Sequence, residues 1–532
     1  MTSMDRRAFI LTSAAAGTGI LMAKGRIKAD TAANGASLEI EEATVAALRT
    51  AMENGSISSA KLVKDYLERI DAVDKKINSI VEINPDAVEI AEKLDDERKQ
   101  GKIRGRMHGI PVVIKENIDT ADRMKTTAGS LALMDAPAPK RDAFIVEQLR
   151  NAGAVIIAKS NLSEWANFRS SNSSSGWSGR GGQTRNPYIL DRNPCGSSSG
   201  TGAAIAANLA AVGIGTETDG SIVCPSSICG IVGLKPTVGL ISRSGIIPIS
   251  HTQDTAGPMS RTVADAAALL SVLTAADKHD SATATNRGKI EADYEQFLTA
   301  DGLKGARIGV ARDFWGKRPE VDAIADKALA AMKDAGAVLV DVKFPTLKKF
   351  GDAEFQVLLY EFKAGLEKYL AERGGKYRTL NDLIKFNEDN AEREMPYFKQ
   401  EIFEQAAKKG LLSSSQYQTA LKKCRLLSQT QGIDAVVVEN KLDAIVAPTN
   451  APTWMIDLVN GDCGSNYVSS SSIAAVAGYP SITVPAGSEK ELPIGVSFFG
   501  RAYTEPQLLR VAYAFEQATK ARRVPKFLPT AA

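Results

Sequence analysis

Strand-like apolar runs alternate with helix-forming segments between residues 110 and 213, and this alternation constrains the fold more than any other feature of the chain. The runs IPVVI at 110–114 and AVIIAKS at 154–160 are rich in Val and Ile, as buried strands are. The segments DAFIVEQLRNAG at 142–153 and GTGAAIAANLAAVG at 200–213 favour helices. Strands that alternate with helices predict an α/β fold, in which helices form layers around a sheet.

The rest of the chain extends this pattern without dividing it. We predict helices over 43–104, and strands again at LDAIVAPT (442–449) and SITVPAG (481–487). From about Phe350 to Gly432 the sequence is helical and polar, which suits either an insertion that shapes a substrate cleft or a solvated surface layer. No linker or repeat separates parts of residues 30–532, so we predict one large domain.

Composition excludes several classes of partner. The 532 residues are 44% hydrophobic and 24% charged, which is typical of a soluble globular enzyme. A formal net charge of +3, with basic residues scattered along the chain, gives no electrostatic footprint for nucleic acid or for an anionic membrane. No segment approaches the roughly 20 uninterrupted apolar residues that span a bilayer. We expect a monomer that binds neither nucleic acid nor membrane.

The N-terminus carries a candidate export signal. Arg6 and Arg7 precede the modest apolar stretch LTSAAAGTGILMA, and this combination resembles a twin-arginine signal peptide. We assign residues 1–29 to this signal and place its removal near Ala29 to Ala36, so that the mature protein is periplasmic or secreted. The alternative is a cytosolic protein with a basic tail.

Cysteine usage and glycine motifs do not predict a metal or a cofactor. The five cysteines form no grouping with ligand spacing for zinc, because Cys224 and Cys229 lack a second pair or a histidine cluster. In an oxidising compartment these two residues can form a disulfide, and otherwise they are buried thiols. Gly213-Ile214-Gly215 lacks the third glycine of a dinucleotide-binding loop. We therefore expect no metal and no cofactor.

Two glycine-serine loops and a lysine predict nucleophilic catalysis. Ser197 in CGSSSGTG and Ser221 in GTETDGSIVCP are separated by a helix-forming run that can bring the two loops together. The chain has only three histidines, and none lies in a convincing position for a base. Lys115 follows the apolar run Ile110–Ile114, and burial lowers the pKa of a lysine so that its neutral amine can accept a proton.

Long motifs resemble the amidase signature family over nearly the whole chain after the signal. They include IPVVIKENID, CGSSSGTGAA, GTETDGSIVCPSSICGIVGLKPTVGLISRSGIIPIS, QDTAGPM and AVAGYPSITVP. Within the family, WANFRSSNSSSGWSGRGGQTRNPY and LLYEFKAGLEKYL are most similar to the peptide amidases. The resemblance implies a three-layer α/β/α domain with a mixed central sheet and no cofactor.

The resemblance also implies the roles of individual residues. Ser221 is the nucleophile that forms an acyl-enzyme, Ser197 is the bridging serine after a cis peptide bond, and Lys115 is the base. Residues expected to bind the oxyanion or the substrate are Thr218, Asp219, Gly220, Ser198 and Asn167. Asp219 stands where many relatives carry glycine, and an aspartate adopts unusual φ values less readily.

The substrate is the least constrained part of the prediction. The resemblance implies hydrolysis of the C-terminal carboxamide of peptides, to the free acid and ammonia. Alternatives with the same chemistry are hydrolases of fatty-acid, aryl or short aliphatic amides, because the shape of the cleft decides among them. A glutamyl-tRNA amidotransferase A-like subunit is a further alternative, although the export signal argues against it. A protein that only binds amides is the least favoured.

Overall fold

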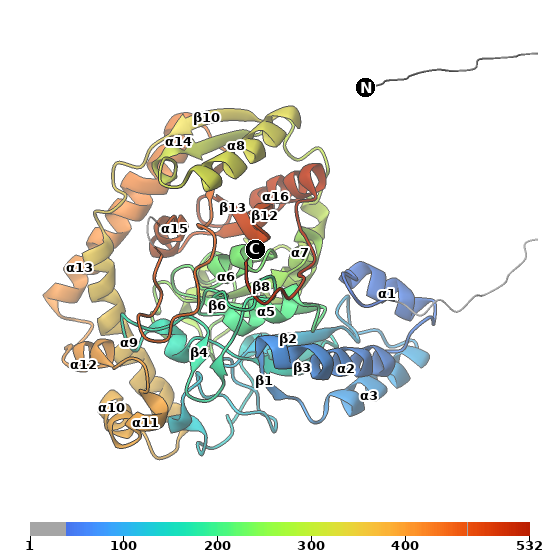
Figure 1. The fold of residues 1–532 in the computed structure, drawn as a ribbon, viewed down its shortest axis with the longest axis vertical. Coiled ribbons are helices and arrows are strands. Elements are labelled where there is room, and N and C mark those ends of the chain that lie inside the picture. The colour runs from blue at the N-terminus through green and yellow to red at the C-terminus, as the bar shows by residue number, and fades with distance from the viewer. Residues whose placement is uncertain (1–38, 465–466, 532) are drawn as a thin grey trace, which may run out of the picture. The chain divides into compact units, whose positions relative to one another are not determined.

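A mixed sheet of eleven strands runs through the described part of the protein, residues 39–464 and 467–531 of the computed structural model (Figure 1). The candidate signal at 1–29 lies outside the described residues. The strands are β1 (Ile80–Ile83), β2 (Pro111–Lys115), β3 (Val155–Ser160), β6 (Val212–Glu217), β7 (Val232–Lys235), β8 (Thr255–Ser260), β9 (Arg307–Ala311), β10 (Val338–Val342), β11 (Ala444–Pro448), β12 (Ser481–Glu489) and β13 (Leu492–Phe499). Their order across the sheet is β1-β3-β2-β6-β8-β7-β12-β13-β11-β9-β10.

Parallel pairing occurs near both ends of the sheet and antiparallel pairing in the middle. Strands β3, β2 and β6 are parallel neighbours, and so are β11, β9 and β10. The strands from β6 through β8, β7, β12 and β13 to β11 pair antiparallel. Helices flank the sheet, so the predicted single α/β domain with a mixed sheet is confirmed.

The helices before and around the first strands follow the sequence closely. Their bounds are α1 (Val45–Glu53), α2 (Ser59–Ile77), α3 (Ala87–Lys99), α4 (Phe144–Asn151), α5 (Ser199–Ala206), α6 (Val223–Ile228), α7 (Val263–Leu273) and α8 (Pro319–Asp334). Ser58 caps α2, and its hydroxyl accepts a hydrogen bond from the Lys61 amide at 3.1 Å. The side chains of α5 are all buried, which suits its run of Gly, Ala, Ser and Thr against the sheet.

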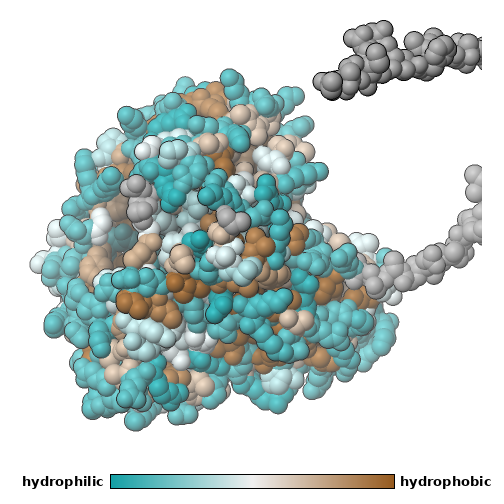
Figure 2. Space-filling view, viewed as in Figure 1, coloured by the Kyte–Doolittle hydropathy of each residue, from teal (hydrophilic) through white to brown (hydrophobic). Residues whose placement is uncertain are grey.

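The chain between β10 and β11 is largely helical and forms the left side of Figure 1. These helices are α9 (Gly351–Arg373), α10 (Leu380–Asp389), α11 (Ala391–Glu394), α12 (Glu401–Ala407), α13 (Ser415–Arg425) and α14 (Asp434–Asn440). The last two described helices are α15 (Ser471–Ala477) and α16 (Glu505–Thr519). No helix in the described ranges is long and apolar enough to cross a membrane. On the face drawn in Figure 2, hydrophilic residues predominate and hydrophobic ones are scattered among them.

Two elements differ from the sequence prediction. Strand β1 lies before α3 and was missed, because it has only four residues and none is fully buried. The helix predicted over 200–213 ends at Ala206 instead, and its last residues belong to β6. Asn208 adopts a left-handed φ of 61°, which stops the helix. Its side chain is held by hydrogen bonds of 2.8 Å with the amide and the carboxylate of Glu42.

The two central parallel strands determine where the candidate site lies. In the register of β2 and β6, Val112 is opposite Val212 and Ile114 is opposite Ile214. The carboxyl ends of these strands therefore meet at one edge of the sheet, with Lys115 as the last residue of β2. Helix α5 begins two residues after Ser197 and leads the chain back into β6, whose end carries the loop to Ser221. The sheet thus brings Lys115 and both glycine-serine loops together.

Candidate active site

Lys115 contacts one of the two predicted catalytic serines directly. Its Nζ donates to Ser197 Oγ at 2.7 Å and to Thr216 Oγ1 at 2.9 Å. A longer contact of 3.3 Å reaches the Thr216 carbonyl. Lys115 and Ser197 have no exposed surface, and Thr216 is 8% exposed. Asn117 also donates to Thr216 Oγ1, at 3.0 Å, and so fixes the hydroxyl that faces the lysine.

Burial gives Lys115 the proton affinity of a base that works near neutral pH. Loss of solvation lowers its pKa to about 7, while the nearby carboxylates of Asp254 and Glu217 act in the opposite direction. Lys159 and Lys235 are also fully buried, and burial lowers the pKa of each to about 8. Low pKa alone therefore does not identify the base. Among these three lysines, only Lys115 contacts a serine of the two loops.

The two serine loops are joined through their backbones. The peptide bond between Gly196 and Ser197 is cis, as the family resemblance implies. The amide of Ser198 donates to the carbonyl of Ser221 at 3.2 Å, which places the half-buried Ser221 next to the loop that carries Ser197. Just after Ser221, the Glu217 carboxylate accepts hydrogen bonds from the amides of Ile222 at 2.8 Å and Val223 at 3.0 Å. Glu217 therefore fixes the start of α6.

Three consecutive backbone amides around Ser221 are free to bind an anion. The N–H groups of Asp219, Gly220 and Ser221 donate no hydrogen bond to another residue of the described chain. The left-handed φ in this loop, 82°, belongs to Gly220 and not to Asp219. The aspartate that replaces glycine in this chain therefore carries no unusual backbone conformation. Free amides in this arrangement can stabilise the negative charge that develops on a carbonyl oxygen under attack.

Side chains from three directions hold this loop. Thr218 donates from its hydroxyl to Asp254 at 2.6 Å, and Asp254 also accepts from two backbone amides of the loop at 249–250. The Asp219 carboxylate accepts a hydrogen bond of 2.6 Å from Ser471, at the start of α15. Burial raises the pKa of Asp254 to about 6, so that this carboxyl is largely ionised at neutral pH.

Ser198 and Asn167 occupy different environments. The Ser198 hydroxyl donates to the Thr216 carbonyl at 3.1 Å and accepts from the Thr216 amide at 3.2 Å. Ser198 is fully buried and borders neither of the two cavities beside the loops, so its contacts tie the loop to β6. Asn167 donates to Ser175 Oγ at 3.0 Å, borders a cavity, and its buried Oδ1 accepts no hydrogen bond from the described residues.

Two cavities flank the serine loops. The first, of about 310 Å³, is the Ser197 cavity, and the second, of about 320 Å³, is the Gly196 cavity. Residues around the Ser197 cavity include Asn117, Ser197, Thr216, Arg243, His251 and Tyr369. Those around the Gly196 cavity include Asn167, Gly196, Asp219, Gly220, Trp454 and Tyr467. The free amides belong to the loop that borders the Gly196 cavity.

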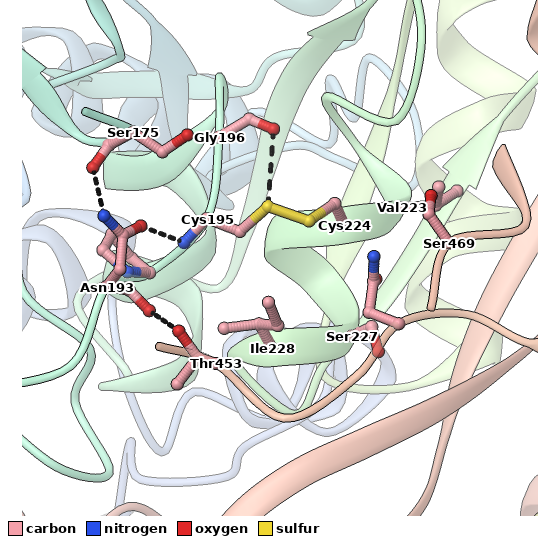
Figure 3. The surroundings of a disulfide bond; sticks show 12 residues. Ser175, Asn193, Cys195, Gly196, Val223, Cys224, Ser227, Ile228, Thr453 and Ser469 are labelled. Atoms are coloured by element: carbon pink, nitrogen blue, oxygen red, sulfur yellow. Dashed lines mark hydrogen bonds between the residues drawn. A yellow bond between two sulfur atoms is a disulfide. The ribbon is translucent and has the colours of Figure 1, made fainter. Parts of the chain in front are cut away.

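A disulfide joins the two serine loops (Figure 3). It links Cys195 to Cys224, with their Cα atoms 6.2 Å apart. Asn193, beside it in Figure 3, accepts a hydrogen bond of 2.8 Å from the Cys195 amide. The pairing considered in the sequence, Cys224 with Cys229, does not occur, and Cys229 is a buried free thiol. The sequence did not show the pairing because 29 residues separate the two cysteines and only the return through α5 and β6 brings them together.

Sequence reasoning missed three residues of this site. Thr216 and Asn117 complete the surroundings of the Lys115 amine, and Glu217 caps α6. Their position next to predicted catalytic residues was the only signal, because Thr, Asn and Glu near a strand end are common in any protein. In the described ranges, no group of three or more His, Cys, Asp or Glu side chains is placed to hold a metal ion.

Comparisons with known proteins agree on one family. The family model described as Amidase matches residues 61–509. A protein named probable amidase from Arabidopsis thaliana is 41% identical, over 92% of this chain and 93% of its own length. A glutamyl-tRNA(Gln) amidotransferase subunit from Thermoanaerobacter pseudethanolicus is 34% identical, over 92% and 99%. The native peptide amidase from Stenotrophomonas maltophilia is 48% identical and superposes with a TM-score of 0.87, over 91% and 99% of the two chains.

Proposed function

The chain belongs to the amidase family and is an amide-hydrolysing enzyme, and we propose that Ser221, Ser197 and Lys115 form its catalytic triad. The observation that carries this proposal is the 2.7 Å contact between the Lys115 amine and Ser197 Oγ. A lysine with a pKa of about 7 is half neutral at that pH and can accept a proton from the serine. Ser197 then relays the proton of Ser221.

The proposed reaction has two halves. In the first, the Ser221 oxygen attacks the amide carbon while its proton passes through Ser197 to Lys115. The amides of Asp219, Gly220 and Ser221 bind the oxyanion, and each such donor is typically worth about 3–4 kcal/mol of transition-state stabilisation. The proton returns through Ser197 to the departing nitrogen, which leaves as ammonia. In the second half, water attacks the acyl-enzyme through the same relay and releases the acid.

We propose the C-terminal carboxamide of peptides as the substrate. The likeness to the peptide amidase of Stenotrophomonas maltophilia supports this choice, because it extends over nearly the full length of both chains. The Gly196 cavity adds physical support, since Trp454 and Tyr467 offer apolar surface and the unpaired Asn167 Oδ1 offers an acceptor for a peptide N–H. An extended ligand that is partly polar suits this lining.

Mass spectrometry of a peptide amide after incubation tests the substrate. We expect the mass change of –NH2 to –OH at the C-terminus, release of ammonia and no cleavage of internal peptide bonds. Fatty amides and free glutamine serve as comparison substrates. Internal fragments, or activity on the comparison substrates alone, would disprove the peptide amide proposal while leaving the triad in place.

A fluorophosphonate probe tests the nucleophile separately. We expect Ser221→Ala to abolish both turnover and covalent labelling while the fold is retained, because the attacking oxygen is removed. Ser197→Ala should also abolish turnover, since Lys115 then lacks a relay to Ser221. The matched control is Ser199→Ala in the same loop, because the Ser199 hydroxyl donates to the Cys195 carbonyl and not to the relay. Labelling that persists in Ser221→Ala would place the nucleophile elsewhere.

We also propose that the protein is exported. The support is the pair Arg6-Arg7 with its apolar stretch, together with the Cys195–Cys224 disulfide. Structural disulfides persist in oxidising compartments such as the periplasm and are rare in the cytosol. A periplasmic or secreted enzyme fits both observations.

A further inference from the structure

One glutamine connects the oxyanion loop to a carboxyl group outside the triad. The Gln253 side-chain amide donates to the carbonyl of Thr218 at 3.3 Å and to Glu354 Oε1 at 3.1 Å. Gln253 is 2% exposed, and Glu354 lies on α9, in the helical segment between β10 and β11. The segment that the sequence associates with cleft shaping thus reaches the loop at 218–220.

This connection determines the direction of an oxyanion donor. The carbonyl of Thr218 and the N–H of Asp219 belong to one planar trans peptide group, so they point in opposite directions. When Gln253 holds the carbonyl, the Asp219 N–H is turned the other way. That N–H is one of the three amides that donate to no residue of the described chain.

Glu354 also lies beside the Asp219 side chain. Burial, and next the Asp219 carboxylate, raise the pKa of Glu354 to about 8, so it is mostly protonated at neutral pH. The neutral carboxyl can accept from Gln253 and donate to Asp219. Asp219 itself is fixed by Ser471. The other ionisable groups near this pair are the Cys424 thiol, whose pKa is raised by burial and by Glu354, and Lys235, which acts on Asp219.

We propose that Glu354 is a positioning residue for amide hydrolysis, which in its neutral form holds the loop at 218–220 through Gln253 and Asp219. The inference rests on the proposed role of this loop in binding the oxyanion. Loss of the proton places two carboxylates side by side in a poorly solvated environment, where their repulsion displaces Asp219. The free amides then lose their alignment, and turnover falls at alkaline pH while substrate binding is retained.

The test measures kcat and KM against pH for the wild type, Glu354→Gln and Glu354→Ala. Glutamine stays neutral and can replace both hydrogen bonds, so we expect kcat within about threefold of wild type at neutral pH and no alkaline fall. Alanine removes the support of Gln253, so kcat should drop about 10- to 100-fold with little change in KM.

A matched control uses a second buried carboxyl on α9. Glu361 accepts from Ser250, Thr252 and Tyr417 and makes no hydrogen bond to the loop at 218–220 within the described chain. Glu361→Gln should lower thermal stability and leave the alkaline fall in place. An alkaline fall that persists in Glu354→Gln, or disappears equally in Glu361→Gln, would overturn the proposal. The acid limb of the same profiles reports Lys115, so failure of the proposed triad would appear there and not in the alkaline limb.

Discussion

The Lys115 amine combines two effects of burial that oppose each other. The side chain has no exposed surface, and desolvation lowers its pKa from the ordinary 10.5 to about 7. A free amine at neutral pH is what a general base requires. The same desolvation weakens the fold, because the unfolded chain binds a proton that the folded chain releases. Function and stability therefore depend on this residue with opposite sign.

The pH dependence of catalysis follows from the direction of the Lys115 shift. Below pH 7 the amine is protonated and cannot accept the serine proton, so kcat/KM should fall about tenfold for each further unit of acidity. Above pH 7 the acid limb should level off. Lys115→Met should lose nearly all activity at every pH. An acid limb that persists unchanged in a partly active Lys115→Met would assign it to another group.

The stability of Lys115→Met tests the other side of this balance. The folded pKa of about 7 lies below the unfolded value near 10.5, so the penalty is absent above the unfolded pKa, grows as pH falls and is complete below pH 7. Replacing the amine with a methionine of similar length should therefore raise the free energy of unfolding at neutral pH, by on the order of a few kcal/mol. The gain should shrink toward pH 10.5. Urea unfolding at two pH values measures it, and equal effects at both would contradict a buried neutral lysine.

At the scale of the elements, the sequence predicted what local pattern determines. The apolar strands β2 and β3 and the capped helix α2 are visible in composition, spacing and the Ser58 cap. The ends of elements were less predictable, because the small residues after Ala206 suit both a buried helix and a buried strand, and pairing of β6 with β2 and β8 decides. The triad positions were implied by family motifs, while the Thr216 contact and the disulfide depend on long-range packing that local sequence does not encode.

The disulfide is an element-scale constraint on the site. Its closed loop contains Ser197, α5, β6 and Ser221, with 29 residues between the cysteines. A crosslink of this span is worth about 3–4 kcal/mol in the chain-entropy model. Cys195→Ser with Cys224→Ser should lower the free energy of unfolding by that order and reduce kcat several-fold, because the backbone contact between Ser198 and Ser221 alone then couples the loops.

Chemical reduction should reproduce this loss in the wild type and cause no further change in the double variant. The control is Cys463→Ser, because Cys463 is an exposed free thiol and should affect neither quantity. Thermal unfolding with and without reductant, combined with thiol titration, makes the measurement. Wild-type stability that does not respond to complete reduction would show that the bridge contributes nothing to the fold.

At the scale of the whole molecule, the candidate signal and the disulfide make a joint prediction about location. Residues 1–29 lie outside the described structure, so their sequence alone supports export, whereas the bridge is part of the folded domain. A chain that stays in the reducing cytosol should keep Cys195 and Cys224 as thiols, and an exported chain should close the bridge. Redox state thus reports location independently of cell fractionation.

Replacing Arg6 and Arg7 with lysines tests both readouts in one experiment. We expect the variant to remain as unprocessed precursor in the cytoplasm, with Cys195 and Cys224 accessible to alkylation after denaturation, while the intact chain is processed and oxidised outside the inner membrane. Because the substitutions lie outside the enzyme domain, oxidation of the purified variant in vitro should restore full activity. Normal processing of the double-lysine chain would remove the twin-arginine proposal, and a closed bridge in the retained precursor would separate disulfide formation from export.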